Sequence, residues 1–116
     1  LGLLLVEMGR PDEAVDQLRR AVTIEPRNAR GHYNLGLLLQ PLGRIEEAEQ
    51  ELVRAAELQP SNLDVLYALA DYYLKRGRLE DAAAIADRMI AAHPEERIGH
   101  DLRKLVENSP PPPAVN

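Results

Sequence analysis

The sequence predicts an all-α fold: a solenoid of antiparallel helix pairs that repeats every 34 residues and ends in one closing helix. The first observation is that small and turn-forming residues recur at this interval along the 116-residue chain. The five columns are Gly2, Gly36 and Ala70; Gly9, Gly43 and Gly77; Arg10, Arg44 and Arg78; Ala14, Ala48 and Ala82; and Pro26, Pro60 and Pro94. The second is the abundance of Leu and Ala, both good helix formers. A fixed period of this length indicates a repeat architecture, here about three repeats.

Each predicted helix is bounded by residues that start or stop helices. Glycine suits a left-handed residue after a helix end, proline cannot continue a helix, and Asn or Ser caps the next one. The candidate caps are Asn28, Ser61 and Asn62. The predicted helices cover residues 1–8, 12–24, 29–40, 45–58, 63–76, 79–93 and 97–107. Pro11 sits at a tolerated first-turn position, whereas Pro41 should end or bend its helix about one turn early.

The two ends of the chain differ. Residues 1–8 are only the remnant of a first helix, so we expect a truncated first repeat and a longer parent protein. The predicted last helix is amphipathic, as expected of a helix that covers the final pair. Its apolar face holds Ile98, Leu102, Leu105 and Val106, and its opposite face holds Arg103, Lys104 and Glu107. The proline-rich residues 108–116 predict a disordered tail, or alternatively a docking peptide for a proline-reading domain.

Composition argues against several classes of function. The net charge is -5 and no basic block is present, which argues against nucleic-acid binding. No apolar run approaches the roughly 20 residues that span a bilayer, so we expect no membrane insertion. Cysteine is absent, which excludes disulfides and thiolate sites and is compatible with cytoplasm or periplasm. The excess of Arg over Lys and the many Ala favour a bacterial source.

Side chains suited to catalysis or metal binding are few. The hydroxyls of Thr23, Ser61 and Ser109 lie at predicted helix ends, where capping explains them. His32 is expected to be a packing residue, and His93 a helix C-terminal residue favoured by the helix dipole. A metal site at His93 and His100 would need carboxylates, and no zinc spacing is present. Acidic pairs recur in the first turn of each second helix, at Asp12-Glu13, Glu46-Glu47 and Glu80-Asp81. We therefore expect no enzyme activity and no cofactor.

Residues 1 to about 96 resemble the tetratricopeptide repeat (TPR) family. The second repeat carries the family pattern in His32, Leu35, Gly36, Leu39, Ala48, Leu52, Ala55 and Pro60. The first carries it in Leu1, Gly2, Leu5, Ala14, Leu18, Ala21 and Pro26, and the third in Leu66, Leu69, Ala70, Tyr73, Ala82, Ala86, Met89 and Pro94. Ala86 and Met89 depart from it as a small-for-large swap. The resemblance implies a right-handed TPR domain over 1–107, with repeats at about 1–28, 29–62 and 63–96 and a capping helix at 97–107.

The resemblance also implies a concave groove lined by the first helix of each pair, where the family usually binds peptides. The predicted groove residues are Arg30, Tyr33, Asn34, Leu37, Tyr67, Asp71 and Lys75. The same register adds Gln40, Asp64 and Ala68, and, in the truncated repeat, Leu3, Val6 and Glu7. Tyr33 and Tyr67 share a column and could grip an extended peptide, or they could merely cover the helix faces.

Some TPR domains clamp the C-terminal carboxylate of chaperones with Lys, Asn and Arg side chains. The corresponding positions within this chain are Leu3, Asn34, Asp64 and Ala68, and only Asn34 matches. Chaperone-tail binding is therefore not expected.

The leading hypothesis is a protein–protein interaction or scaffold module whose partner is another protein or a preceding domain of the same chain. An alternative is the C-terminal arm of a larger enzyme or multihaem electron-transfer protein, which docks a partner domain. Self-assembly through residues 1–6 is a third hypothesis. The sequence upstream of Leu1 would distinguish the first two.

Overall fold

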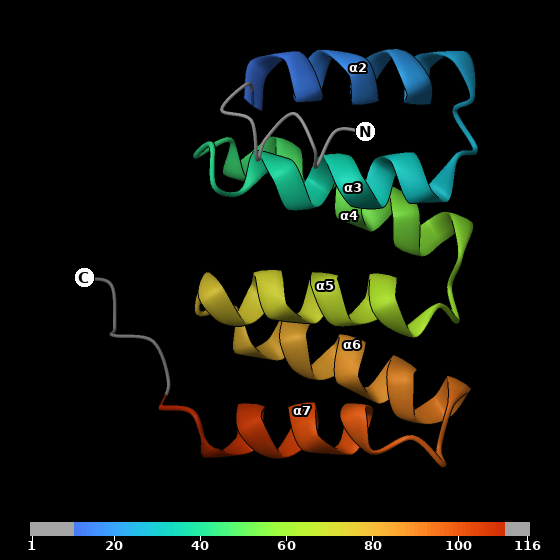
Figure 1. Cartoon of the computed structure of the whole chain (residues 1–116). Helices are drawn as coiled ribbons and strands as arrows, with labels where there is room; N and C mark the ends of the chain where they lie inside the picture. The colour runs from blue at the N-terminus through green and yellow to red at the C-terminus, as the bar shows by residue number, and fades with distance from the viewer. Residues whose placement is uncertain (1–10, 111–116) are drawn as a thin grey trace. The chain divides into compact units, whose positions relative to one another are not determined.

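The structure, a computed structural model, describes residues 11–110, and within that range it contains six helices and no strand. The helices are α2 (Pro11–Ile24), α3 (Ala29–Leu39), α4 (Ile45–Leu58), α5 (Leu63–Lys75), α6 (Leu79–Ala92) and α7 (Arg97–Asn108). The chain divides into two compact units, Leu1–Pro60 with α2 to α4 and Ser61–Asn116 with α5 to α7 (Figure 1). The all-α prediction is confirmed. The predicted helix 1–8, the tail beyond Pro110 and the residues Leu3, Val6 and Glu7 lie outside the described residues.

Asparagine starts the first helix of each complete pair. The Asn28 side chain accepts a hydrogen bond of 2.9 Å from the Gly31 N–H, and the Asn62 side chain accepts one of 3.2 Å from the Val65 N–H. These bonds satisfy backbone donors that the first helical turn otherwise leaves without a partner. Both caps were predicted. Ser61 instead contributes its backbone carbonyl, which lies 2.6 Å from Nε2 of His93.

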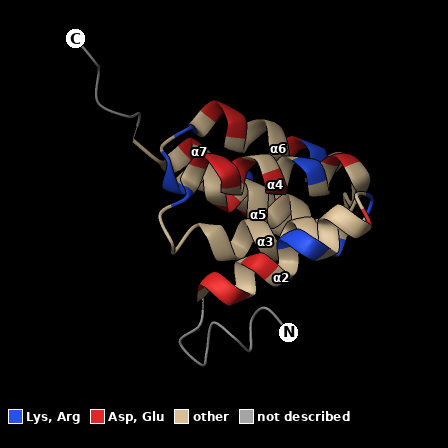
Figure 2. Ribbon diagram, turned by 90° about the horizontal axis from the view of Figure 1, so that it is seen from above, with Lys and Arg blue, Asp and Glu red and all other residues tan. Residues whose placement is uncertain are grey.

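Arginine and an acidic residue start the second helix of each pair. The Arg44 Nε donates to Glu47 Oε1 at 2.9 Å, and the Arg78 Nε donates to Asp81 Oδ2 at 2.9 Å. The carboxylates lie in the first turn, where the helix dipole favours negative charge. The same acidic first turn opens α2, and Figure 2 shows acidic residues at its start and basic residues toward its end. The recurring acidic pairs are therefore explained by helix initiation, as predicted.

Gly43 and Gly77 close the first helix of each complete pair in a left-handed conformation. Their φ angles are 78° and 73°, which a side chain with a Cβ adopts only at a cost. In the first unit, the Gly43 N–H donates to Gln40 O at 2.9 Å and the Arg44 N–H donates to Leu39 O at 3.0 Å. The second unit repeats both bonds 34 residues later, from Gly77 and Arg78. The two bonds form the Schellman motif that ends many helices.

Pro41 shortens α3 by less than the predicted full turn. Helix α3 ends at Leu39, whereas α5 continues to Lys75, two residues further in the same register. Gln40 keeps a right-handed helical conformation before the proline, and the chain still closes through Gly43. The proline therefore removes one backbone donor near the helix end without redirecting the turn.

Small residues allow the helices of the first unit to approach closely. A Cβ added at Gly36 would lie 2.7 Å from Leu52 Cγ and 3.3 Å from the Ala48 carbonyl oxygen. Leu52 and Ala48 of α4 are themselves fully buried. Because real Cβ atoms do not approach so near, only glycine permits this packing of α3 on α4. The column of small residues thus has the packing role that the sequence predicted.

Helix α7 covers the second unit through Gly99 and Leu102. A Cβ at Gly99 would lie 3.0 Å from Met89 Cβ of α6, and Leu102 is buried. Leu105, however, was predicted to share this buried face, and that prediction is wrong, because 53% of its surface is exposed. Leu105 corresponds to Asp71 of α5, a position that turns toward solvent.

Candidate functional site

In the first unit, the candidate residues lie on one side of α3. Arg30, Tyr33 and Leu37 are spaced by three and four residues and therefore share a helix face, with Asn34 beside them. The other sides of α3 are buried against α2 and α4, with Leu35 and Leu39 in the core. Arg30 is exposed, and Tyr33, Asn34 and Leu37 are half-buried. The α3 row, defined as these four residues, presents a ring, an amide and an aliphatic side chain to solvent.

In the second unit, the corresponding residues lie on α5. Tyr67 is 42% exposed, and Asp71 and Lys75 follow on the same face. The Lys75 Nζ forms an ion pair of 2.9 Å with Asp71 Oδ2. Asp64 begins this α5 row, which we define as Asp64, Tyr67, Asp71 and Lys75.

The tyrosines of α5 have two different environments. Tyr72 and Tyr73 are buried, and their rings meet edge to face with centroids 5.6 Å apart. The Arg78 guanidinium lies 4.6 Å from the centroid of the Tyr73 ring. Tyr67, in contrast, leaves much of its ring in water. The packing of α5 therefore uses Tyr72 and Tyr73, but it does not need the exposed part of Tyr67.

Sequence reasoning therefore found residues that the structure places together on each helix, one set per unit. That Tyr33 and Tyr67 face a single groove stays a prediction. Leu105 of α7 was missed as a surface residue, because its apolar character suggested the core. Its correspondence to Asp71 in the 34-residue register was the signal that could have identified it.

His32 is a buried hydrogen-bonding residue as well as the packing residue predicted. Its Nδ1 lies 2.9 Å from Glu51 Oε1 of α4, and its Nε2 lies 2.9 Å from the Pro26 carbonyl oxygen. Both partners accept, so the ring makes both bonds when each nitrogen carries a proton. His32 thereby connects the turn after α2 to α4. The sequence signal for the bond to proline is the six-residue spacing from Pro26 to His32, which recurs from Pro94 to His100. His100 Nε2 indeed lies 3.1 Å from the Pro94 carbonyl oxygen.

Arg19 and Glu47 connect α2 to α4 within the first unit. The Glu47 carboxylate accepts from Arg19 and, at 2.9 Å, from Nε of Arg44. The hydrogen bond from Arg19, followed by that from Arg44, lowers the pKa of Glu47 below its ordinary value of 4.5. All three side chains are substantially exposed, so this cluster is a surface ion-pair network that links α2 to α4.

The remaining histidines and the surface hollows lie at or near helix ends. His93 ends α6, where its ring lies near the Ser61 carbonyl and its Nδ1 is 3.8 Å from Glu95 Oε1. Within residues 11–110, no group of three or more His, Cys, Asp and Glu residues could hold a metal ion. Hollows of about 350 and 330 Å³ lie at Gly43–Glu47 and at Gly77–Asp81, which are corresponding turns. Both are bordered by the Arg–carboxylate pairs that start α4 and α6.

Across the described part of the chain, no helix has both the length and the apolar character to cross a bilayer. The helix pairs, the solvent-facing rows and the recurrent caps define a class of protein: an α-helical repeat module that mediates protein interactions.

The chain belongs to the tetratricopeptide repeat family. The family model described as tetratricopeptide repeat matches residues 42–105, more than half of the chain, and a second, described as TPR repeat, matches residues 2–43. No curated protein sequence matches the chain significantly. The predicted resemblance to this family is therefore confirmed.

Solved structures share the fold. A tetratricopeptide repeat protein from Parabacteroides merdae superposes with a TM-score of 0.81 at 24% identity, over 90% of this chain and 42% of that one. The MamA fragment from Desulfovibrio magneticus gives 0.76 at 21%, over 92% and 60%. The first TPR of Spaghetti (RPAP3), bound to an HSP90 peptide, gives 0.76 at 19%, over 91% and 86%. The chain thus spans about half of the first two proteins.

Proposed function

We propose that the chain binds an extended segment or a helix of a partner protein along the α3 and α5 rows, with Tyr33 and Tyr67 as anchors. The observation that carries the proposal is the 42% exposure of Tyr67 on the same helix as two buried tyrosines. Tyrosine is favoured at binding surfaces because its rigid ring buries much area and its hydroxyl can hydrogen-bond.

The character of the two rows supports a peptide ligand. The α3 row combines aromatic, amide, aliphatic and cationic groups, and the α5 row combines aromatic and charged groups. Apolar contact and hydrogen bonding are therefore both available to an extended chain. The rows stand on packed helices, and a rigid scaffold lowers the ordering cost of binding. The Spaghetti fragment binds an HSP90 peptide, SRMEEVD, on a similar fold.

The ligand we propose differs from a chaperone tail. Asp64 is acidic and Ala68 is buried at positions where carboxylate-clamping members of the family carry polar or basic groups, and only Asn34 agrees. An acidic peptide end would meet repulsion from Asp64 and Asp71 in the second unit. Chaperone-tail peptides thus make a useful negative probe.

Selection of short random peptides displayed on phage tests the proposal. We expect enriched peptides that bind the wild-type chain and lose affinity by about tenfold or more with Tyr33→Ala plus Tyr67→Ala, since aromatic anchors commonly contribute most of the binding energy. Circular dichroism and Tm should stay near wild type, because neither ring belongs to the core.

Ile24→Ala is the matched control, since Ile24 of α2 is a large apolar residue that is 79% exposed and lies off both rows. Its affinity for the selected peptides should stay within about twofold of wild type. Selected peptides that bind the double tyrosine variant as tightly as wild type would place the site elsewhere.

A further inference from the structure

The second unit presents a solvent-facing surface built from α5 and α7 together. The two helices contact each other within this unit. Ile98, Asp101 and Leu105 of α7 follow the α5 row by 34 residues and have the same three- and four-residue spacing. We define the α5–α7 face as Asp64, Tyr67, Asp71, Asp101 and Leu105.

Exposed apolar surface is concentrated on this face. Tyr67 is 42% exposed and Leu105 is 53% exposed, and they are two of the three large apolar side chains exposed in residues 11–110. Ile98, which lies on the same face of α7 as Leu105, is half-buried. Exposed apolar groups bordered by polar ones are typical of protein interaction sites. Leu105 therefore adds a residue of α7 to the solvent-facing surface that the α5 row begins.

The charges on the same face are unbalanced. Asp64, Asp71 and Asp101 carry three carboxylates, and Lys75, the cation of the α5 row, is bound to Asp71 at 2.9 Å. In the described part of the chain, neither Asp64 nor Asp101 forms an ion pair. The side chains that border Tyr67 and Leu105 therefore favour a positively charged ligand.

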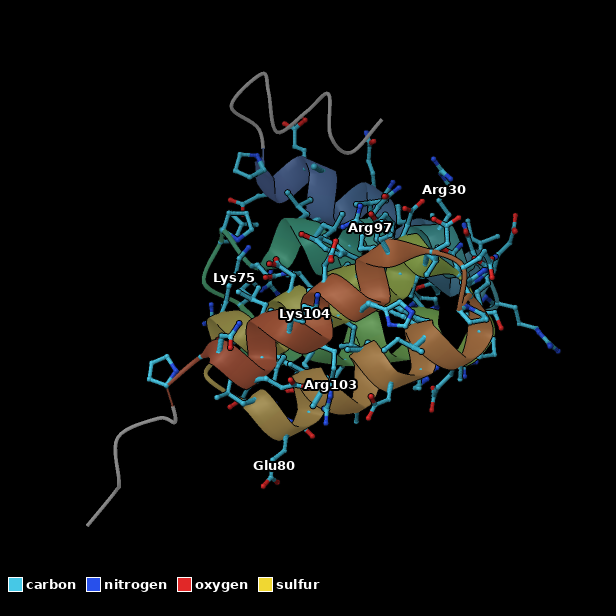
Figure 3. The ribbon with its side chains drawn as sticks, turned by 90° about the horizontal axis from the view of Figure 1, so that it is seen from below. Arg30, Lys75, Glu80, Arg97, Arg103 and Lys104 are labelled. Atoms are coloured by element: carbon cyan, nitrogen blue, oxygen red, sulfur yellow. The ribbon has the colours of Figure 1, made fainter. Side chains whose placement is uncertain are left out.

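Two cations of α7 lie to the side of this face. Lys104 corresponds to Gly36 and Ala70 in the 34-residue register, the column that packs toward the second helix of a pair. Arg97 precedes Lys104 by seven residues and therefore lies on the same side of α7. Figure 3, in which α7 is nearest to the viewer, shows both side chains. They border the face along its outer edge, and in the structure of residues 11–110 neither forms an ion pair with Asp64 or Asp101.

We infer that the α5–α7 face binds an extended protein segment that combines apolar residues with Lys or Arg. This inference rests on the proposed function and adds the chemistry of the partner. Leucine-like side chains of the segment cover Tyr67 and Leu105, and its cations lie against Asp64 and Asp101. An acidic segment of the same shape is disfavoured by the same carboxylates.

Fluorescence anisotropy with two labelled peptides tests the inference. One probe alternates leucine and arginine, and its twin carries glutamate in place of every arginine. The basic probe should bind at least about tenfold tighter than the acidic twin, and its affinity should fall as salt rises to about 0.5 M. The double variant Tyr67→Ala plus Leu105→Ala should also bind the basic probe more weakly than the wild type does.

Neutralisation of Asp64 and Asp101 together separates a specific site from general attraction. Asp64→Asn plus Asp101→Asn should weaken the basic probe by about fivefold, because each exposed pair contributes modestly. Glu80→Gln is the matched control, since Glu80 projects from the start of α6 away from α7 (Figure 3) and should change affinity by less than about twofold.

The possible failures are distinguishable. Equal binding of both probes, lost with Tyr67→Ala, would overturn the charge inference and leave the proposed function standing. Equal effects of Glu80→Gln and the Asp variants would overturn the inference as well, since the attraction would then be unspecific. If neither probe binds, the inference fails, and the phage selection decides the proposed function separately: enriched peptides that depend on Tyr33 and Tyr67 would preserve it.

Discussion

Gly36→Ala should destabilise the first unit although alanine is the better helix former. An alanine in an open helical position would gain about 1 kcal/mol over glycine. At Gly36 the new Cβ would lie 2.7 Å from Leu52 Cγ and 2.8 Å from Leu52 Cδ2. Overpacking of a filled core costs about 1–3 kcal/mol, so the net loss should be about 1 kcal/mol, and at most about 2 kcal/mol, once the gain in helix propensity is subtracted.

A double-mutant cycle isolates the contact. Leu52→Ala removes the two atoms that the new Cβ would meet and should itself cost about 2–5 kcal/mol. In that background Gly36→Ala should stabilise by about 1 kcal/mol, which gives a coupling of about 1–3 kcal/mol. Urea unfolding followed by circular dichroism measures each free energy, and Ala91→Gly at an exposed position of α6 calibrates helix propensity. A rise in the unfolding midpoint for Gly36→Ala with Leu52 intact would refute the close packing of α3 on α4.

Three further predictions concern turns, caps and charge. Gly43→Ala should cost about 1–2 kcal/mol in urea unfolding, because φ is 78° there and a Cβ would otherwise meet nothing within 4 Å; an unchanged midpoint would contradict a conformational role. Asn62→Ala should cost about 1 kcal/mol through the lost cap, and Asn62→Ser should restore most of it. Glu47→Gln should flatten the fall of Tm below pH 4.5. Because the folded-state pKa of Glu47 is lowered, its ion pair with Arg19 stabilises the fold above pH 4.5 and is lost as the pH falls through that pKa. An identical fall of Tm in acid for the variant and the wild type would argue against this role.

The helix bounds were largely predictable because local residues encode them. Pro60 and Gly77 stop helices by their own backbone limits, and Asn28 starts one by its own side chain. Such signals need no knowledge of the partner helix. The predicted bounds therefore differ from the observed ones by at most one residue for each described helix.

Contacts between helices were not predictable in the same way. The bond from His32 to Glu51 depends on how α3 and α4 face each other, and the bond from Arg19 to Glu47 depends on two long side chains meeting across a surface. The exposure of Leu105 depends on which side of α7 receives a partner helix. Amphipathic spacing alone assigns an apolar residue to the core, and only the repeat register indicates otherwise.

The candidate site lies between these two cases. The register predicted that Arg30, Tyr33 and Leu37 share a face, and α3 brings them together. The register could not predict how far the Tyr67 ring stands in solvent, because that depends on the neighbouring side chains.

Amide chemical shifts of the isotope-labelled chain, titrated with a peptide selected on the wild type, test most directly whether the helix rows bind a partner segment. We predict shifts concentrated at Tyr33 and Leu37 of α3 and at Tyr67, Asp71 and Leu105 of the second unit. The outer side of α2 around Ile24 should shift little. Shifts confined to that side, or to the turns at Gly43 and Gly77, would contradict binding along the rows.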